Sequence, residues 1–357
     1  MHGPLIIMSS HQQQKDFMRD AFPVSEHQRM MEDDVKWRAY ECAIGAAVEG
    51  HGKTVLDVGA GLGALTLMAA AAGARRVYAV EVNPIIADKL RRIVADNEAL
   101  GTIRKGVVVV ITGDIASLEE LHAGVERNSI DVLVSDWMGH MLWYENIWPA
   151  VCVARERWLK PDTGVMLPCA ATLKMAGLSA ESAAYDKIVN LLGVDGSPFR
   201  GRFSFAALHD DIMSAVHPFA DIEVKDLVTK EVVVVEFDLR TAAADAGTVV
   251  VPAFALPLKS LPKIERAGAA AAFVLSFEVS FPNGCKLDAG VTSEMGGTHW
   301  GQCVVALDEY ASPVKNKLQG SLRVETAEGG RMTLRIAYTA QDGAACEVVR
   351  VLAHGQW

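Results

Sequence analysis

The spacing of apolar and polar residues divides the chain into two parts with different periodicities. Between Lys53 and Pro168, short apolar runs alternate with stretches in which apolar residues recur at helical spacing. Such alternation is typical of a mostly parallel sheet with helices on both faces. The expected strands are Thr54–Val58, Val77–Val82, Val107–Thr112 and Ile130–Ser135, and the expected helices are one after Gly63, Ile85–Leu100 and Asn146–Trp158.

Beyond Pro168 the pattern changes to short β-branched and aromatic runs separated by turns that contain glycine. This pattern predicts an antiparallel barrel or sandwich. The expected strands are Ala171–Leu178, Lys230–Leu239, Phe273–Phe281, Cys303–Leu307, Ser321–Glu325 and Arg331–Tyr338.

Two segments of this second half do not fit the strand pattern. Residues from Glu181 to about Val216 have a helical and irregular pattern, which indicates either a protruding arm or an ordinary loop insertion. The tract Ala267–Ala272 is of low complexity and is interpreted as a surface linker.

The N-terminal part completes the division of the chain. Apolar residues from about Ser25 to Val48 recur at near-helical spacing and predict one or two amphipathic helices. Residues 1–15 are polar and rich in glutamine, and we expect no fixed structure for them. The expected parts are a tail with helices over residues 1–51, an α/β domain over 52–168, and a β domain over 169–357 with the inserted segment at about 181–216.

Composition narrows the class of protein. With 357 residues, of which 50% are hydrophobic, the chain can bury a large core and form two domains. Its formal net charge of −10 argues against direct nucleic-acid binding and favours a cationic partner. The sequence has no run of 18 uncharged apolar residues and no signal-peptide core, so we expect a soluble, intracellular protein without membrane contact.

The six cysteines are scattered, with no C-x-x-C pair and no histidine at ligand spacing. Six cysteines could form bridges in a secreted chain, but reduced and mostly buried thiols fit this spacing better. We therefore predict neither a metal site nor structural disulfides.

The most informative motif is VLDVGAGLG, residues 55–63, which joins the first strand to the following helix. Gly59, Gly61 and Gly63 allow a sharp turn and a close approach of the backbone to a ligand. Glu81 follows 18 residues later, at the end of the second strand, where a carboxylate can accept both hydroxyls of an adenosine ribose. The motif is that of a Rossmann-type nucleotide site.

The glycines alone are compatible with both NAD and S-adenosylmethionine, because Gly59, Gly61 and Ala64 also match the dinucleotide pattern. Asp57 favours the methyl donor. A carboxylate two residues before the first glycine would repel a pyrophosphate but would suit the cationic amino group of S-adenosylmethionine. A chance match in an α/β unit that binds no nucleotide is the remaining alternative.

A second candidate site is the loop SDWMGHMLWYEN, residues 135–146, which follows the fourth strand. Asp136 and Glu145 stand nine residues apart with Gly139 between them, so a hairpin can bring both carboxylates together at the C-terminal edge of the sheet. Two carboxylates in a slot walled by aromatics repel each other unless a cation lies between them, and a planar guanidinium matches them better than an ammonium does. An exposed acidic loop is the other explanation.

With these residues the chain resembles the protein arginine methyltransferases from about Phe17 to the C-terminus. The family's double-glutamate loop follows the pattern S-E-x-M-G-x-x-L-x-x-E, and a second family loop reads T-H-W. The matching residues are Ser135, Asp136, Met138, Gly139, Leu142 and Glu145 in the first loop, and Thr298, His299 and Trp300 in the second. The form that keeps M-G and T-H-W is similar to the type I enzymes, which make asymmetric dimethylarginine.

The resemblance implies the roles of individual residues. Asp136 and Glu145 would hold the guanidinium, and His299 with Asp33 would form a proton relay, Asp33 lying on a lid helix over the cofactor. The residues implied for binding S-adenosylmethionine are Asp57, Gly59, Gly61, Gly63, Glu81, Asp114, Ile115, Lys36 and His27, and those implied for binding the substrate are Met30, Trp137, Met138 and Trp300. The segment Glu181–Val216 would be a helical dimerisation arm, which implies a homodimer.

Some positions depart from the family pattern. Asp136 replaces a glutamate and is shorter by one methylene, so its carboxylate retreats by roughly 1.5 Å. Lys36 stands where the family has an arginine for the cofactor carboxylate, with Arg38 as a nearby alternative. Lysine can supply the charge but not the fork of donors.

Three apolar replacements add to these departures. Phe17 and Ala21 stand in place of a tyrosine pair, and Ile147 stands where type I members often have methionine. Together these departures affect the prediction of how many methyl groups are transferred more than the prediction of the enzyme class.

The sequence therefore predicts a cytoplasmic or nuclear protein arginine N-methyltransferase that uses S-adenosylmethionine. The expected substrates are basic protein segments, such as those of histones or RNA-binding proteins, and the expected products are mono- and asymmetric dimethylarginine. The alternatives are an arginine methyltransferase with another product, a small-molecule methyltransferase, and a catalytically weak scaffold of the same fold.

Overall fold

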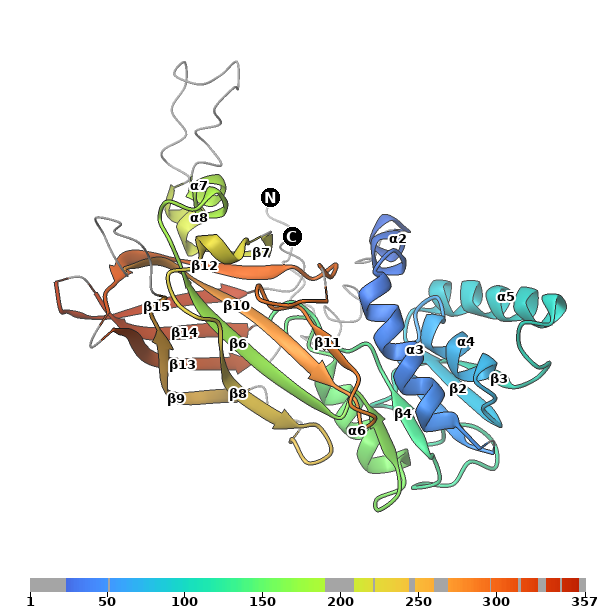
Figure 1. The fold of residues 1–357 in the computed structure, drawn as a ribbon. Coiled ribbons are helices and arrows are strands. Elements are labelled where there is room, and N and C mark those ends of the chain that lie inside the picture. Colours follow the sequence, from blue (N-terminus) through green and yellow to red (C-terminus); the bar gives the residue numbers. More distant parts are fainter. Residues whose placement is uncertain are drawn as a thin grey trace, which may run out of the picture.

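The structure is a computed structural model that describes residues 24–50, 52–189, 209–220, 222–243, 248–259, 269–295, 297–313, 316–326, 332–340 and 342–352. Residues 1–15, for which the sequence predicts no fixed structure, lie outside the described part. Figure 1 shows two parts, one built on a parallel sheet and the other on antiparallel strands, with the N-terminal helices against the first.

The first part contains the N-terminal helices and a five-stranded parallel sheet of order β3-β2-β1-β4-β5. The helices are α2 (Val24–Met31), α3 (Asp34–Val48), α4 (Ala64–Ala71), α5 (Pro84–Leu100) and α6 (Trp148–Trp158). The strands are β1 (Thr54–Val58), β2 (Arg76–Glu81), β3 (Val108–Thr112), β4 (Val132–Val134) and β5 (Val165–Leu167). The predicted alternation of strands and helices is therefore confirmed.

The register of this sheet brings the two predicted motifs to the same edge. Val58 of β1 pairs with Val80 of β2, and Asp57 pairs with Val134 of β4. The carboxyl ends of parallel strands lie at one edge of a sheet, where ligands bind in open α/β folds. The glycine turn after β1 and the acidic loop after β4 consequently emerge side by side.

Local sequence signals set the ends of α5. Asn83 accepts hydrogen bonds from the backbone N–H groups of Ile85 (2.9 Å) and Ile86 (3.4 Å), and Pro84 occupies the first turn. Gly101 ends the helix at φ 72°, a left-handed conformation that favours glycine. The helix therefore begins at Pro84, three residues after Glu81, and fixes the short turn that follows β2.

The second part consists of antiparallel strands in two sheets, of order β7-β12-β10-β6-β8, with β11 paired to β10, and β15-β14-β13-β9. The strands of the first sheet are β6 (Ala170–Leu178), β7 (Val216–Ala220), β8 (Val232–Asp238), β10 (Ala270–Ser280), β11 (Lys286–Asp288) and β12 (Gln302–Ala311). Those of the second are β9 (Thr248–Pro257), β13 (Lys317–Thr326), β14 (Met332–Thr339) and β15 (Ala345–Leu352).

Single bridges, Thr229 to Leu258 and Ala311 to Ala340, join the two sheets. The predicted antiparallel domain is confirmed, and within the described residues it is two bridged sheets rather than one continuous barrel wall. A short 3₁₀ helix, η2 (Val224–Asp226), precedes β8.

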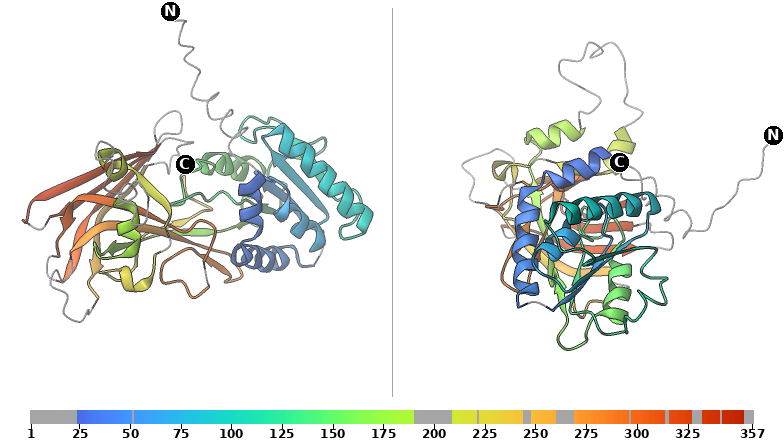
Figure 2. Two further views of the ribbon diagram at one scale, coloured as in Figure 1. Left: turned by 90° about the horizontal axis from the view of Figure 1, so that it is seen from above. Right: turned by 90° about the vertical axis from the view of Figure 1, so that its right-hand side faces the viewer.

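Two short helices, α7 (Ala183–Val189) and α8 (His209–Ser214), lie within the predicted inserted segment and project from one side of the β domain (Figure 1). The helical pattern predicted between Glu181 and Val216 is thus present at both of its described ends. In Figure 2 the view from above shows the two parts of the molecule next to each other along its long axis.

The interpretation of Ala267–Ala272 as a surface linker is wrong for its described end. Ala270, Ala271 and Ala272 are fully buried at the start of β10, the strand that pairs with both β6 and β12. Small side chains suit a strand that is covered on both faces, so the low complexity of this tract reflects tight packing.

The prediction that no disulfide forms is also wrong. The structure joins Cys42 on α3 to Cys285, which follows the β10–β11 turn. Tyr40 of α3 packs edge-on against Phe281 beside this bridge, with ring centroids 5.1 Å apart. The two cysteines are separated by 243 residues, so their spacing in the sequence carried no sign of the contact. The bridge ties α3 to the β domain.

Among the described residues, no helix combines the length and the apolar character needed to span a bilayer. Within the same residues, no group of three or more His, Cys, Asp or Glu side chains is arranged to hold a metal ion.

Candidate functional site

The turn after β1 forms an open cradle. Gly59, Gly61 and Gly63 have φ angles of 73°, 56° and 90°, which side chains other than that of glycine rarely adopt. A Cβ atom built on Gly59 or Gly61 would meet no described atom within 4 Å, whereas one on Gly63 would overlap the side chain of Leu90. Gly59 and Gly61 therefore leave space for a ligand, and Gly63 permits the close packing of α4 against α5.

Glu81 closes one side of the cradle. Its carboxylate accepts hydrogen bonds from the backbone N–H groups of Gly61 (2.9 Å) and Asn83 (2.8 Å). Burial raises the pKa of Glu81, and the backbone hydrogen bonds partly offset that effect. The glutamate thus fixes the shape of the glycine turn in addition to facing the cavity.

The cradle and the acidic loop line one cavity. Its wall includes residues from α2 and α3, from the glycine turn, from the end of β2 and from the acidic loop. The lining residues that bear on function are Met30, Lys36, Trp37, Gly59, Gly61, Gly63, Glu81, Asn83, Asp136, Glu145 and Ile147.

A second cavity adjoins the first and shares Gly59, Glu145 and Ile147 with it. Its other wall contains Asp114 and Ile115. Asp114 accepts hydrogen bonds from the backbone N–H of Ala116 (3.0 Å) and from Ser117 Oγ (3.1 Å), so its carboxylate holds its own turn in shape.

Asp57 lies behind these cavities rather than among their lining residues. It is fully buried, and its Oδ2 accepts a hydrogen bond from Thr66 Oγ1 at 2.6 Å, while Oδ1 has no partner within the described structure. Burial, together with the negative charges of Glu81 and Asp136, raises the pKa of Asp57 to about 7. A nearby cation would favour its ionised form.

The acidic loop folds as the predicted hairpin. Gly139 and Leu142 exchange two backbone hydrogen bonds of 2.9 and 3.0 Å, and Met141 and Leu142 have positive φ angles of 54° and 73°. A Cβ atom on Gly139 would lie 2.8 Å from both the backbone nitrogen and the Cγ of Glu145. The glycine is therefore what lets Glu145 return to the cavity beside Asp136.

The structure gives Lys36 a protein partner that the sequence did not predict. Its ammonium is fully buried and forms an ion pair with Asp136 Oδ2 at 3.0 Å, while also lying 4.0 Å from the ring centroid of Trp37. Asp136 Oδ1 is buried and has no partner among the described residues. Lys36 thus lies beside Asp136 in the cavity that also contains the glycine cradle, and its predicted role with the cofactor carboxylate stays a prediction. The suggested alternative, Arg38, is exposed and pairs with Asp34 at 3.5 Å.

Glu145 is held in an unfavourable environment for a charge. Burial, and then the negative charge of Asp136, raise the pKa of Glu145 to about 8, although the ammonium of Lys36 opposes the shift. Lys36 compensates Asp136, and a further cation in the slot would stabilise Glu145 in its ionised form.

His299 and Asp33 form a close pair. Asp33 Oδ2 accepts hydrogen bonds from the backbone N–H of His299 (2.9 Å) and lies 2.7 Å from His299 Nδ1. Asp33 Oδ1 caps α3 by accepting from the backbone N–H of Lys36 at 2.9 Å. Burial acts to raise the pKa of Asp33, but these hydrogen bonds outweigh it and the pKa is lowered. The pair connects the start of α3 to the T-H-W loop.

Trp300 connects the T-H-W loop to the acidic loop. Its Nε1–H donates to the carbonyl oxygen of Met138 at 2.9 Å, and its ring lies 3.9 Å from that of His299, centroid to centroid. Trp137 packs against Trp148 in the core, with ring centroids 4.9 Å apart, so it supports the loop from behind instead of lining the cavity as predicted.

The remaining predicted residues divide between the cavity and its support. Met30 lines the cavity. The side chain of Met138 is buried, and its Sδ accepts a hydrogen bond from the hydroxyl of Tyr40 at 3.9 Å. Met138 therefore supports the acidic loop from the core. His27 lies on α2, but its side chain is outside the described structure, as are Phe17 and Ala21.

Sequence reasoning missed Tyr40, whose hydroxyl donates to the carbonyl oxygen of Ser135 at 2.9 Å and so fixes the base of the acidic loop. The sequence marked Tyr40 only as an apolar position of a helix. It also missed Trp37, which lines the cavity beside Lys36.

Comparisons with known proteins agree with this geometry. A family described as "FtsJ-like methyltransferase" matches residues 42–148, and one described as "Arginine methyltransferase oligomerization subdomain" matches residues 199–342. The chain is 31% identical over 318 residues to protein arginine N-methyltransferase 1 of Chlamydomonas reinhardtii, covering 87% of this chain and 84% of that protein.

Two further similarities extend the comparison. A probable protein arginine N-methyltransferase 3 of Arabidopsis thaliana is 32% identical over 292 residues, which is 80% of this chain and 47% of the relative, so the chain spans about half of that longer protein. Among solved structures, the Trypanosoma brucei PRMT1 enzyme-prozyme heterotetrameric complex with AdoHcy has a TM-score of 0.74 at 24% identity, covering 91% of this chain and 97% of that one. At this identity the match shows the fold.

Proposed function

The chain belongs to the protein arginine N-methyltransferase family, whose members use S-adenosylmethionine, and we propose that it methylates arginine side chains of basic protein substrates to mono- and asymmetric dimethylarginine. The observation that carries the proposal is the meeting of Asp136 and Glu145 in the same cavity as the glycine cradle.

The residues around the cradle fit S-adenosylmethionine. Gly59 and Gly61 leave open space at the backbone, and Glu81 presents a carboxylate that can accept ribose hydroxyls. Asp57 lies behind the cradle and does not line the cavity, and its buried negative charge would favour a cationic group in the cavity next to it. We assign Asp114 and Ile115, in the adjoining cavity, to the same ligand. When bound, the cofactor supplies an electrophilic methyl group on its sulfonium.

The slot residues prepare the guanidinium. A guanidinium is always protonated in proteins and spreads its charge over three nitrogens, so it is a weak nucleophile. Asp136 Oδ1 and Glu145 can accept N–H groups and draw positive charge away from the remaining nitrogen. Such positioning can lower the barrier by on the order of several kcal/mol.

The substrate guanidinium must lose a proton during or after methyl transfer, and Glu145 is suited to accept it. The pKa of about 8 places Glu145 near the pH at which a general base is most effective. The bond between Asp33 and His299 Nδ1 fixes the orientation of the imidazole, and we propose this pair as the relay beyond Glu145.

The net charge of −10 supports basic protein segments, such as those of histones or RNA-binding proteins, as substrates. A location in the cytoplasm or the nucleus is part of the proposal.

The product proposal rests on the M-G and T-H-W residues. Because Asp136 is shorter than glutamate, the slot has at least as much room for a second methyl on the same nitrogen. The competing result is that the retreat of one carboxylate loosens the monomethylated substrate, since a displacement of about 1 Å can cost some 10²-fold in rate.

A time course with chromatographic separation of the three methylarginines tests the product proposal. We expect monomethylarginine first and asymmetric dimethylarginine later. Monomethylarginine that persists as the sole product would contradict the proposed product, and symmetric dimethylarginine would contradict the proposed orientation of the substrate as well.

We further propose a homodimer formed through the segment between α7 and α8. Support comes from the match to an oligomerisation subdomain over residues 199–342 and from the two projecting helices. Deleting about Asp186 to Leu208 is expected to give an inactive monomer, because the activity of a dimeric enzyme depends on assembly. Light scattering and a methyl-transfer assay on the same sample measure both effects, and a deletion variant that stays dimeric or fully active would exclude the arm.

A further inference from the structure

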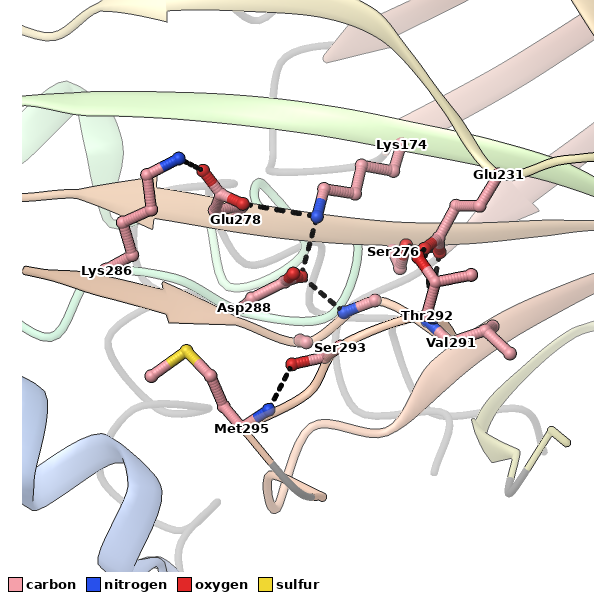
Figure 3. A network of polar contacts seen from close by, with 12 residues as sticks. Lys174, Glu231, Ser276, Glu278, Lys286, Asp288, Val291, Thr292, Ser293 and Met295 are labelled. Atoms are coloured by element: carbon pink, nitrogen blue, oxygen red, sulfur yellow. Dashed lines mark hydrogen bonds and ion pairs between the residues drawn. The ribbon is translucent and has the colours of Figure 1, made fainter. Parts of the chain in front are cut away.

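Glu231, the residue directly before β8, binds a loop of the β domain with both carboxylate oxygens (Figure 3). Its Oε1 accepts from Ser276 Oγ at 2.7 Å and from the backbone N–H of Val291 at 3.0 Å. Its Oε2 accepts from the backbone N–H (3.2 Å) and the hydroxyl (2.6 Å) of Thr292. Four donors therefore converge on one side chain.

A second carboxylate fixes the start of the same loop. Asp288, the last residue of β11, accepts from the backbone N–H of Gly290 at 2.8 Å and forms an ion pair with Lys174 at 2.8 Å. A Cβ atom on Gly290 would lie 2.7 Å from Glu231 Oε2 and 2.9 Å from Asp288 Oδ1. The backbone of the loop is thus enclosed between two carboxylates, as Figure 3 shows.

The loop leads directly into the T-H-W residues. Seven positions after Thr292 the chain reaches His299, whose backbone N–H and ring both contact Asp33. On the other side of the T-H-W residues, Gln302 donates from Nε2 to the carbonyl oxygen of Ala289 at 3.1 Å. The segment from Ala289 to Gln302 is therefore closed at its base, and His299 stands within it.

We infer that Glu231 is a positioning residue for the methyl-transfer reaction, because it anchors the loop that presents His299 to Asp33. The inference rests on the proposed function for the role of His299. Glu231 touches neither the cavity lining nor Asp33, so it acts through the loop.

The charge of Glu231 suits this role. Burial acts to raise its pKa, but the hydrogen bonds from Thr292, Ser276 and Val291 outweigh it and the pKa is lowered. An amide cannot replace the carboxylate here, because its NH₂ group would face a backbone N–H on whichever side it lay, and both would be donors.

Two pairs of variants test the inference in the full-length protein. Glu231→Gln removes one acceptor, and Glu236→Gln, at an exposed position of the adjoining strand β8, is its control. Thr292→Val removes the hydroxyl donor without changing the shape of the side chain, and Thr292→Ser keeps that donor. We expect Glu231→Gln and Thr292→Val to lower kcat roughly tenfold, as expected for a modest displacement of a reacting group. Both controls should stay near wild type, and the KM for S-adenosylmethionine should not change.

A double-mutant cycle separates positioning from general support. If Glu231 acts through His299, then combining Glu231→Gln with His299→Ala gives no further loss beyond His299→Ala alone. The inference would be overturned if the losses in kcat of Glu231→Gln and His299→Ala multiply in the double variant. An equal loss of cofactor affinity in these two single variants would overturn it as well.

Hydrogen exchange tests the anchoring without any assay of activity. Amides between Ala289 and Gln302 should exchange faster in Glu231→Gln than in Glu236→Gln. An unchanged rate would overturn the inference even if the enzyme is active. A wild-type protein without methyl transfer would instead contradict the proposed function, while the exchange result would still decide whether Glu231 holds the loop.

Discussion

Replacing Glu145 by glutamine is expected to abolish methyl transfer while making the folded protein more stable at neutral pH. The variant lacks the second anionic partner for a buried guanidinium, which should lower the rate by roughly 10² to 10³. Cofactor affinity should remain close to wild type, because Glu145 belongs to the acidic loop and lines the same cavity as the glycine cradle without being part of that cradle.

The gain in stability follows from the raised pKa of Glu145. The unfolded carboxyl titrates near its ordinary value of 4.5, and the folded one titrates at about 8. Between these values the folded state binds more protons than the unfolded state, so this group makes the protein less stable as pH rises. Glutamine removes that cost, and an increase of a few degrees in Tm is expected at pH 8 with little change at pH 4.

The same pKa predicts the pH dependence of the wild-type reaction. Because the free enzyme needs ionised Glu145 to hold the guanidinium, kcat/KM should rise with pH through about 8. Rate profiles and thermal melts of wild type, Glu145→Gln and the exposed control Glu156→Gln measure these effects. Activity of Glu145→Gln within about threefold of wild type, a small fraction of the loss expected for a transition-state contact, would show that the slot is elsewhere.

The second large effect is expected at Glu81. Glu81→Gln should weaken the binding of S-adenosylmethionine and of its demethylated product by more than about tenfold, because the amide must turn its NH₂ toward the N–H of either Gly61 or Asn83. One backbone N–H of the glycine turn then loses its acceptor, and the ribose hydroxyls lose their carboxylate partner. The variant should still fold, since α5 keeps its cap at Asn83.

Calorimetric titration measures this prediction, with Glu126→Gln as an exposed control on the same domain. NAD should not bind to any of the three proteins. Cofactor affinity that is equal in Glu81→Gln and the control would contradict the assignment of the cradle, as would tight binding of NAD by the wild type.

The parts of the fold with local signals were predictable from the sequence. Periodicity located four of the five parallel strands to within a few residues, since buried parallel strands are continuous apolar runs and their helices have caps such as Asn83 and Gly101. The strands β5, β7, β9, β11 and β15 were missed. β9 contains Pro252 and Pro257 and pairs only with β13 in its sheet, and edge strands of this kind have weak patterns.

The candidate site was predictable where residues in one loop act together. The glycine between Asp136 and Glu145 predicted the hairpin that places both carboxylates in one cavity, although the turn itself lies between Gly139 and Leu142. The partner of Lys36 was not predictable, since the pairing depends on how α3 packs against the acidic loop 100 residues further along the chain.

Contacts between distant segments left no sign in the sequence. The bridge between Cys42 and Cys285 joins α3 to the β domain, and the four hydrogen bonds to Glu231 join segments within the β domain. Only the folded chain brings these residues together. Ala270 was misread for a related reason, because composition cannot distinguish an exposed linker from a tightly packed central strand.

The most direct measurement of the central claim compares two basic peptides that differ only by arginine or lysine at one position. Each is incubated with the protein and isotopically labelled S-adenosylmethionine, and mass spectrometry locates the label. If Asp136 and Glu145 hold a guanidinium, the label appears on arginine nitrogen and is absent from the lysine peptide. Label on lysine, or none on arginine while the cofactor is bound, would contradict the account.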